Sequence, residues 1–250
     1  HTLLLLLVPA ALASGQTRGF LVSSRNAEPL ATEEALRAQV EFLTDSLCTG
    51  RATGTTGSTW AQGGIARQFA SVGLLPSGGS YFHGFQSDTG RPAHNVIGFL
   101  PGIDSRYVVI AAHYDHIGTL DGKLYPGADS NASGVAALLT IAKMFKHLQE
   151  LGRNFSHSVI FVALDAKEQS LGGSRQLWRE IENGLLTDPK TGAPVSEKQI
   201  DRMVNIDQVG GTEAPLHKGR PDFLIMLSDE KDGRREALYM ANTEPGLNLD

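Results

Sequence analysis

The sequence has very little cysteine, no long apolar run and no excess of positive charge. A single cysteine, Cys48, excludes both an intrachain disulfide and a thiolate cluster that could hold a metal. Because no run of about 18 apolar residues occurs, we expect no membrane-spanning helix. The formal net charge of −5 provides no basic surface for nucleic acid. Any bound metal must therefore rely on His, Asp and Glu side chains.

The remaining composition is that of an ordinary globular protein. Of the 250 residues, 41% are hydrophobic and 20% are charged, which allows one large core or one core with a small appendage. No internal repeat or low-complexity tract is visible. We therefore expect one principal domain.

The first residues resemble a targeting segment. Leu3–Val8 forms a short apolar core, and Ala11-Leu12-Ala13 has the small-x-small pattern of a signal-peptide cleavage site. We expect residues 1–13 to be a clipped secretory signal, 14–30 a polar linker, and 31–250 a single domain truncated at its C-terminus. A frayed apolar N-terminus is the alternative. The signal would make the protein secreted or periplasmic.

Apolar periodicity and turn signals predict alternating helices and strands. Helices are expected at 32–47, 58–72, about 132–150, 172–183 and about 230–242, and strands at 94–100, 107–112, 158–164, 200–207 and 222–227. The Pro-Gly turn between the first two strands predicts a hairpin. The unit from 107 to 164 should be a parallel, right-handed strand–helix–strand crossover. The order of elements predicts a three-layer α/β/α sandwich with a mixed, mostly parallel sheet.

Polar side chains mark the ends of the predicted buried strands. His113, Glu168 and Asp207 end or follow such strands, and Asp129 stands just ahead of an apolar helix. Charged groups at one sheet edge are unfavourable unless they are paired or bind a metal. A set of His and carboxylate ligands suits zinc, and also manganese or cobalt. Asp115, two residues after His113, could hydrogen-bond the imidazole and fix its tautomer.

Each of these residues also has a purely structural interpretation. His113 could be a core histidine that is bonded to Asp115. Asp129 could be the N-cap of the following helix. Glu168 could be a solvated loop acid, and Asp207 could stabilise a turn ahead of Gly210-Gly211.

Four motifs, taken together and in order, resemble a known family. They are His113-Tyr114-Asp115, the block Gly-Ala-Asp-Ser-Asn-Ala-Ser-Gly at 127–134, Asp165-Ala166-Lys167-Glu168, and Asn205-Ile206-Asp207. They resemble the motifs of the secreted co-catalytic zinc aminopeptidases, a family that also contains the glutaminyl cyclases and glutamate-carboxypeptidase-like enzymes. The resemblance extends over about 32–207, and the block at 127–134 is its most specific part.

The resemblance implies a role for each residue. His113 would bind one zinc ion, Asp129 would bridge two, Glu168 would bind the second, and Asp207 would complete the first. Asp115 would be the carboxylate behind the histidine ligand. In such sites, paired metals polarise the scissile carbonyl and lower the pKa of a bound water, and a glutamate takes the proton. The implied activity is removal of N-terminal residues from a peptide or small-protein substrate.

Two departures from the family pattern concern this chemistry. The family has two adjacent glutamates, a base and then a ligand, and the first position here is Lys167. A lysine cannot act as base unless its pKa is strongly lowered, and losing a positioned base typically costs roughly 100- to 10,000-fold in rate. Its ammonium would also weaken metal binding. The family's last ligand is a histidine farther downstream than His217, so we expect it beyond Asp250.

Three hypotheses about function remain. The first is a zinc-dependent metallo-exopeptidase that uses metal-activated water and one or two zinc ions. The second is a catalytically degenerate member that binds peptides without turnover, which Lys167 favours. The third is a glutaminyl-cyclase-like acyltransferase with one zinc held by Asp129, Glu168 and a later histidine. The sequence gives no indication of oligomeric state.

Overall fold

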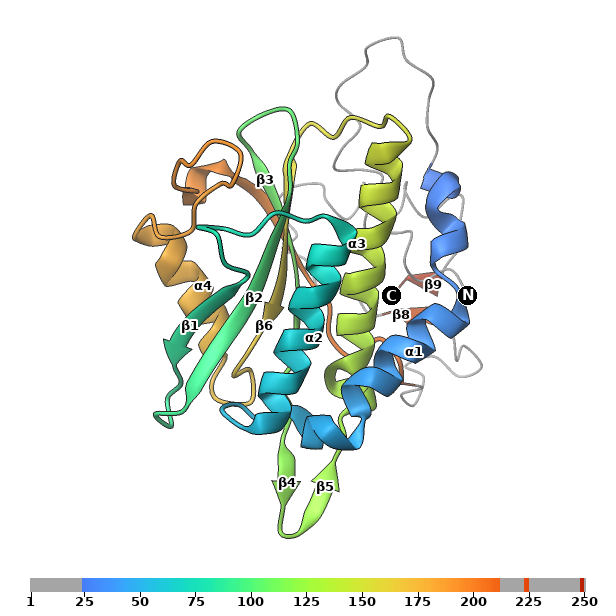
Figure 1. The fold of residues 1–250 in the computed structure, drawn as a ribbon, viewed down its shortest axis with the longest axis vertical. Helices are drawn as coiled ribbons and strands as arrows, with labels where there is room; N and C mark the ends of the chain where they lie inside the picture. Colours follow the sequence, from blue (N-terminus) through green and yellow to red (C-terminus); the bar gives the residue numbers. More distant parts are fainter. Residues whose placement is uncertain (1–23, 212–222, 225–247, 250) are drawn as a thin grey trace.

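The computed structural model describes residues 24–211, 223–224 and 248–249 (Figure 1). Its α-helices are α1 (Glu33–Thr44), α2 (Thr56–Val72), α3 (Gly134–Glu150) and α4 (Gly172–Glu182). Its strands are β1 (Phe82–Gln86), β2 (Pro92–Leu100), β3 (Tyr107–His113), β4 (Gly118–Leu120), β5 (Lys123–Tyr125), β6 (Ser158–Leu164), β7 (Ile200–Asn205), β8 (Phe223–Leu224) and β9 (Asn248–Leu249). Short irregular helical segments are η1 (Ser24–Leu30), η2 (Ser46–Arg51), η3 (Ala128–Ser133) and η4 (Glu197–Gln199).

The main sheet has five strands in the order β1-β2-β6-β3-β7. β6 pairs with β3, and β3 with β7, in parallel; β2 is antiparallel to both β1 and β6. Four strands therefore run one way and β2 runs the other. This confirms the predicted mixed, mostly parallel sheet, and the parallel β3–α3–β6 crossover is confirmed as well.

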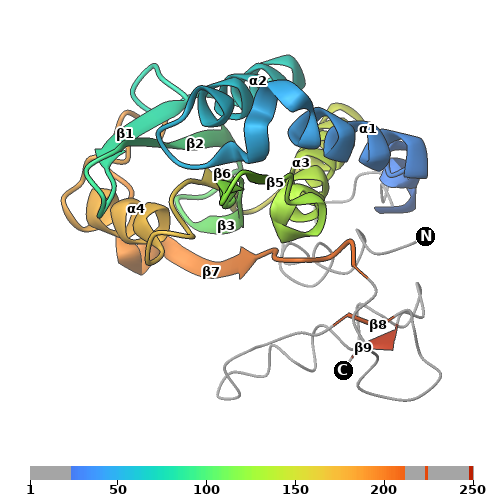
Figure 2. The same ribbon diagram turned by 90° about the horizontal axis from the view of Figure 1, so that it is seen from below.

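Helices cover both faces of this sheet. Its central strands bury successive residues on opposite faces: in β3, Val108 and Ile110 join one apolar cluster, whereas Val109 and Ala111 join another. The first cluster includes side chains of α1, α2 and α3, and the second includes Leu177 of α4. Figure 2 shows the three helices on one side and α4 on the other. The α/β/α sandwich is thus the arrangement that hides strands apolar on both faces.

The helix boundaries follow from local chemistry. The Thr32 hydroxyl accepts a hydrogen bond from the Ala35 amide at 3.1 Å and caps α1, as the sequence predicts. Thr55 caps α2, and Gly73, with φ of 83°, ends it in the left-handed conformation. α1 ends at Thr44, earlier than predicted, because Asp45 accepts from the Leu47 amide and starts η2. Among the helices described, none is long and apolar enough to cross a membrane.

The hairpin predicted for 94–100 and 107–112 is wrong. Both strands form, but β6 lies between them, antiparallel to β2 and parallel to β3. All three strands are buried on both faces, and a Pro-Gly turn links consecutive strands without determining their partners. The sequence also did not indicate β1 or the β4–β5 hairpin. The helix predicted at about 230–242 lies outside the described residues.

Candidate functional site

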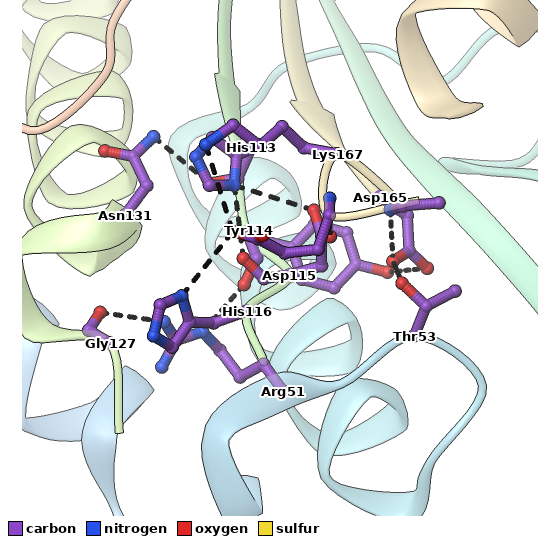
Figure 3. Close-up of polar contacts among 12 residues, drawn as sticks. Arg51, Thr53, His113, Tyr114, Asp115, His116, Gly127, Asn131, Asp165 and Lys167 are labelled. Atoms are coloured by element: carbon purple, nitrogen blue, oxygen red, sulfur yellow. Dashed lines mark hydrogen bonds and ion pairs between the residues drawn. The ribbon is translucent and has the colours of Figure 1, made fainter. Parts of the chain in front are cut away.

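The candidate site lies at the carboxyl ends of the parallel strands. His113 is the last residue of β3, Asp165 directly follows β6, and Asp207 comes two residues after β7. In open α/β sheets this edge is where ligands bind. Figure 3 shows His113 from the end of β3 and Asp165 and Lys167 from the segment after β6. The sequence predicts that His113, Asp129, Glu168 and Asp207 form one site, and the structure brings His113, Glu168 and Asp207 to this edge around Lys167.

Both ring nitrogens of His113 face oxygen acceptors. Nδ1 lies 3.1 Å from the Asp115 carbonyl oxygen, and Nε2 lies 3.2 Å from Asp207 Oδ1. The imidazole is almost fully buried. Burial opposes its charged form, but the Asp115 and Asp207 carboxylates outweigh this effect and raise the pKa of His113. The ring is therefore placed to donate from both nitrogens, as an imidazolium does.

The Lys167 side chain lies between two carboxylates. Its Nζ is 3.8 Å from Glu168 Oε1 and 3.8 Å from Asp207 Oδ2. Since Asp207 Oδ1 faces His113, each oxygen of this carboxylate faces a nitrogen. Lys167 thus supplies a positive charge within the set of residues predicted to hold zinc.

Two buried polar atoms near this cluster have no hydrogen-bond partner among the described residues. One is Asp115 Oδ1, which lies 3.6 Å from His113 Nδ1, beyond hydrogen-bond length. The other is His116 Nδ1, 3.7 Å from Glu168 Oε1. Burial and the Arg51 charge lower the pKa of His116, so its neutral form is favoured. The second carboxylate oxygen of Asp115 accepts from the Glu168 amide at 3.0 Å and fixes that backbone.

Asp129 is hydrogen-bonded to the segment that follows β7. Its Oδ1 accepts from the Gly210 amide at 2.9 Å and lies 3.4 Å from the Ser133 hydroxyl. A Cβ at Gly211 would come within 2.5 Å of its other carboxylate oxygen, so the glycine backbone closes over the side chain. Asp129 therefore holds the segment after β7, and it is not the N-cap of α3, which is Ser133.

Asn131 connects three elements within the same motif. Its amide nitrogen donates to the carbonyls of His113 and Ile206, at 3.2 and 2.9 Å. Its carbonyl oxygen accepts from the Gly134 and Gln208 amides, at 3.1 and 3.0 Å. This side chain is fully buried and fully satisfied, so it fixes the β3 end, the start of α3 and the segment after β7 relative to one another.

A buried carboxylate network positions the segment that carries Lys167. Asp165 accepts from the Thr53 hydroxyl at 2.9 Å, the Tyr114 hydroxyl at 2.8 Å and the His94 amide at 3.1 Å. Burial and the charge of Asp115 raise the pKa of Asp165, although these hydrogen bonds oppose the rise. The network ties the loop after β6 to β2, to β3 and to the loop before α2.

Arg51 holds together the backbone segments next to the site. Its fully buried guanidinium donates to the carbonyls of Tyr114 at 2.7 Å, Pro126 at 2.7 Å and Gly127 at 2.9 Å, and to that of Leu43. Burial lowers the pKa of Arg51 to about 10. Five donors in a fixed plane suit this task, because the four carbonyls come from three separate segments of the chain.

The described residues do not fit a zinc ion as they are arranged. No group of three His, Cys, Asp or Glu side chains within the described ranges could hold one. The 3.2 Å between His113 and Asp207 suits either a hydrogen bond or two ligands of one ion. However, Asp129 already accepts a hydrogen bond from the Gly210 amide. The Lys167 charge is a second obstacle: a unit charge about 4 Å from a dication repels it by about 8 kcal/mol at an effective dielectric of 20, before solvent screening.

Sequence reasoning did not indicate the supporting residues of the site. Arg51 stands alone in a Thr- and Gly-rich loop, and Tyr114 and Thr53 belong to no pattern that predicts their contacts. Asp165 and Asn131 lie inside the motifs but were assigned no role there. Their position within otherwise conspicuous motifs is the one signal that could have identified them.

Comparison with known proteins assigns this fold and motif set to a family. The profile of Peptidase family M28 matches residues 95–231, more than half of the chain. The chain belongs to peptidase family M28.

Two kinds of curated relatives resemble this M28 chain. The BOS complex subunit NCLN of Homo sapiens is 32% identical over 124 residues, which are 49% of this chain and 21% of that protein. Leucine aminopeptidase 1 of Pyrenophora tritici-repentis is 22% identical over 182 residues, which are 72% of this chain and 42% of that protein. The aligned parts thus cover about a fifth of the first relative and less than half of the second.

Solved structures share the fold. LapB of Legionella pneumophila superposes with a TM-score of 0.61 at 21% identity, covering 93% of this chain and 58% of that one. The glutaminyl cyclase of Macrostomum lignano gives 0.64 at 17% identity, covering 96% and 76%. These similarities confirm the predicted zinc-exopeptidase-like α/β fold.

Proposed function

We propose that this M28 chain is a non-hydrolytic member of its family that binds a peptide or protein segment. The observation that carries the proposal is the Lys167 ammonium, 3.8 Å from both Glu168 and Asp207. In this position the family resemblance calls for a carboxylate that takes a proton from water. A lysine ammonium carries three N–H donors and no acceptor, so it cannot take a proton from water as that carboxylate does.

One of the two curated relatives, NCLN, supports the same proposal. NCLN is named as a subunit of a complex, and its aligned segment is the most similar of the relatives described above. A protein that only binds a ligand needs a rigid sheet edge around its site, but it does not need a catalytic base. The Arg51, Asn131 and Asp165 networks provide that support here through ordinary hydrogen bonds.

Hydrolysis of aminoacyl-p-nitroanilides tests the proposal. We expect the full-length wild-type protein to show no turnover above background, with or without added zinc. Lys167→Glu should raise the rate by about 100-fold or more if the base position is correctly assigned. The matched control is Lys198→Glu, which makes the same change at an exposed residue of η4. Zinc-dependent turnover by the wild type, unchanged in Lys167→Glu, would contradict the proposal.

A metallo-exopeptidase is the second candidate. His113 and Asp207 are favourable for it, because their 3.2 Å separation is compatible with a shared zinc ion. The resemblance to leucine aminopeptidase 1 points the same way. This candidate predicts turnover by the wild type that a chelator abolishes, so the same assay separates the two functions.

A glutaminyl-cyclase-like acyltransferase is a weaker proposal. It rests on the fold shared with the Macrostomum enzyme and requires Asp129 and Glu168 at one zinc ion. Here Asp129 is hydrogen-bonded to the segment after β7, whereas Glu168 faces His116 and Lys167. Release of ammonia from an N-terminal glutaminyl peptide is the measurement that would support it.

A further inference from the structure

We propose that the Lys167 ammonium is the resident cation of this site, that is, the positive charge that balances Glu168 and Asp207. On this proposal the wild-type chain excludes zinc, and loss of the lysine charge creates a zinc site. The inference deepens the proposed function and rests on it in part. It concerns the metal affinity of the chain, whereas the proposed function concerns hydrolysis.

The charge distribution of the pocket supports this assignment. Glu168 and Asp207 each present one oxygen to the same ammonium, at 3.8 Å in both cases. One cation shared by two carboxylates is the arrangement that a bridging ion would otherwise provide. Both carboxylates are about one-third exposed, with exposed fractions of 33% and 35%, so the ammonium balances their charges and water screens part of the attraction.

The backbone directs the lysine toward this place. On one side of Lys167, Ala166 is buried, adopts a left-handed φ of 55°, and donates its amide to Asp165 Oδ1 at 2.7 Å. On the other side, the Glu168 amide donates to Asp115 Oδ2 at 3.0 Å. Since both neighbours are anchored to buried carboxylates, the backbone of Lys167 is fixed where its side chain reaches Glu168 and Asp207.

The rest of the pocket retains groups that zinc prefers once the ammonium is removed. His113 and Asp207 lie 3.2 Å apart. His116 Nδ1 lies 3.7 Å from Glu168 and has no hydrogen-bond partner within the part of the chain that the structure describes. These are nitrogen and oxygen donors of the kind that bind zinc. The lysine charge is therefore the obstacle to zinc that a substitution can remove, and the remaining side chains must also move closer together, since no three of those described surround one ion.

Zinc content and zinc affinity test the inference directly. Wild type, Lys167→Gln, Lys167→Met and the control Lys198→Gln would be loaded with zinc chloride, desalted, and analysed by inductively coupled plasma mass spectrometry and calorimetric titration. We expect far less than one zinc per chain for wild type and Lys198→Gln. Lys167→Gln and Lys167→Met should bind zinc at least about tenfold more tightly than wild type. Zinc should raise the melting temperature of these two variants only.

Each outcome is decisive. A wild-type chain that retains one zinc per molecule overturns the inference, and so do folded Lys167 variants that bind zinc no better than wild type. Circular dichroism shows which variants fold. If neither Lys167 variant folds, the zinc content of the wild type still decides, because the inference requires it to be low.

Failure of this inference and failure of the proposed function give different results. A wild type that binds zinc but hydrolyses nothing contradicts the inference that Lys167 is the resident cation, and it is consistent with the non-hydrolytic function. A zinc-free wild type that hydrolyses aminoacyl-p-nitroanilides contradicts the proposed non-hydrolytic function, and it is consistent with the inference that Lys167 is the resident cation.

Discussion

At the scale of single residues, the site depends on buried polar side chains that are satisfied by backbone groups. Arg51 illustrates this best, since it is fully buried and, among the described residues, four of its five N–H donors go to backbone carbonyls and none to a carboxylate. A buried charge is costly unless its donors are satisfied. The chain meets most of that requirement by bringing four carbonyls around one guanidinium.

Replacing Arg51 should strongly destabilise the protein. We expect Arg51→Ala to lower the free energy of unfolding by about 3–5 kcal/mol, because four carbonyls lose their donor and a large cavity forms. Arg51→Lys should recover only part of this loss, since an ammonium cannot reproduce the planar donor geometry. Urea unfolding measures both effects. Arg37→Ala, at an exposed residue of α1, is the control and should leave the midpoint unchanged. A wild-type-like midpoint for Arg51→Ala would contradict the assignment.

At the scale of elements, packing explains a pair of glycines that helix propensity disfavours. Gly63 and Gly64 lie inside α2, where glycine costs about 0.5–1 kcal/mol relative to alanine. A Cβ at Gly64 would lie 2.0 Å from the ring of Phe42 in α1, whereas one at Gly63 would meet only the end of Arg67, at 3.5 Å. Gly64 therefore permits the close approach of α1 and α2, and Gly63 does not contribute to it.

The two glycines should respond oppositely to alanine. Gly63→Ala should stabilise the protein by about 0.5–1 kcal/mol through helix propensity. Gly64→Ala should destabilise it by about 1–3 kcal/mol, because Phe42 must move. Thermal and urea unfolding of both variants give the comparison, and each serves as the control for the other. Equal stabilisation by both would show that the Phe42 contact does not constrain the helices.

At the scale of the whole molecule, the two edges of the sheet carry different polar groups. The carboxyl edge holds the candidate site. Near the opposite edge, Asp201 of β7 pairs with Arg106 and with Arg202, which donates at 2.8 Å. His157, just before β6, is hydrogen-bonded to Asp104 at 2.8 Å. Burial opposes ionisation of Asp201, but Arg202, Arg106 and His157 outweigh it and lower the pKa of this carboxyl.

This cluster should contribute to the pH dependence of global stability. Because the folded-state pKa of Asp201 lies below its unfolded value of about 3.9, its contribution is present above about pH 4 and is lost as the pH falls through the folded pKa. We expect Asp201→Asn to cost at most about 1 kcal/mol at pH 6 and almost nothing at the acid end. Urea unfolding between these limits measures the difference. Asp121→Asn, in the exposed turn between β4 and β5, should show no such convergence.

The sequence by itself determined the layers and the family, and it predicts the site residues. Helix and strand periods are local, so α2, α3, α4 and β6 were predicted closely, and the ends of β3, β6 and β7 identified the edge where His113, Lys167 and Asp207 meet. The substitution of lysine for the expected glutamate is likewise visible without coordinates.

Only the tertiary structure decided which strands pair and which charges meet. β6 lies between β2 and β3 because strand order depends on burial of both faces by distant helices, which a turn of six residues cannot encode. The partners of Arg51 come from segments 8 to 76 residues away along the chain, so no local pattern predicts them. The position of the Lys167 ammonium between Glu168 and Asp207 also depends on the packing of β6 against β3 and of β3 against β7, because that packing brings the three strand ends together.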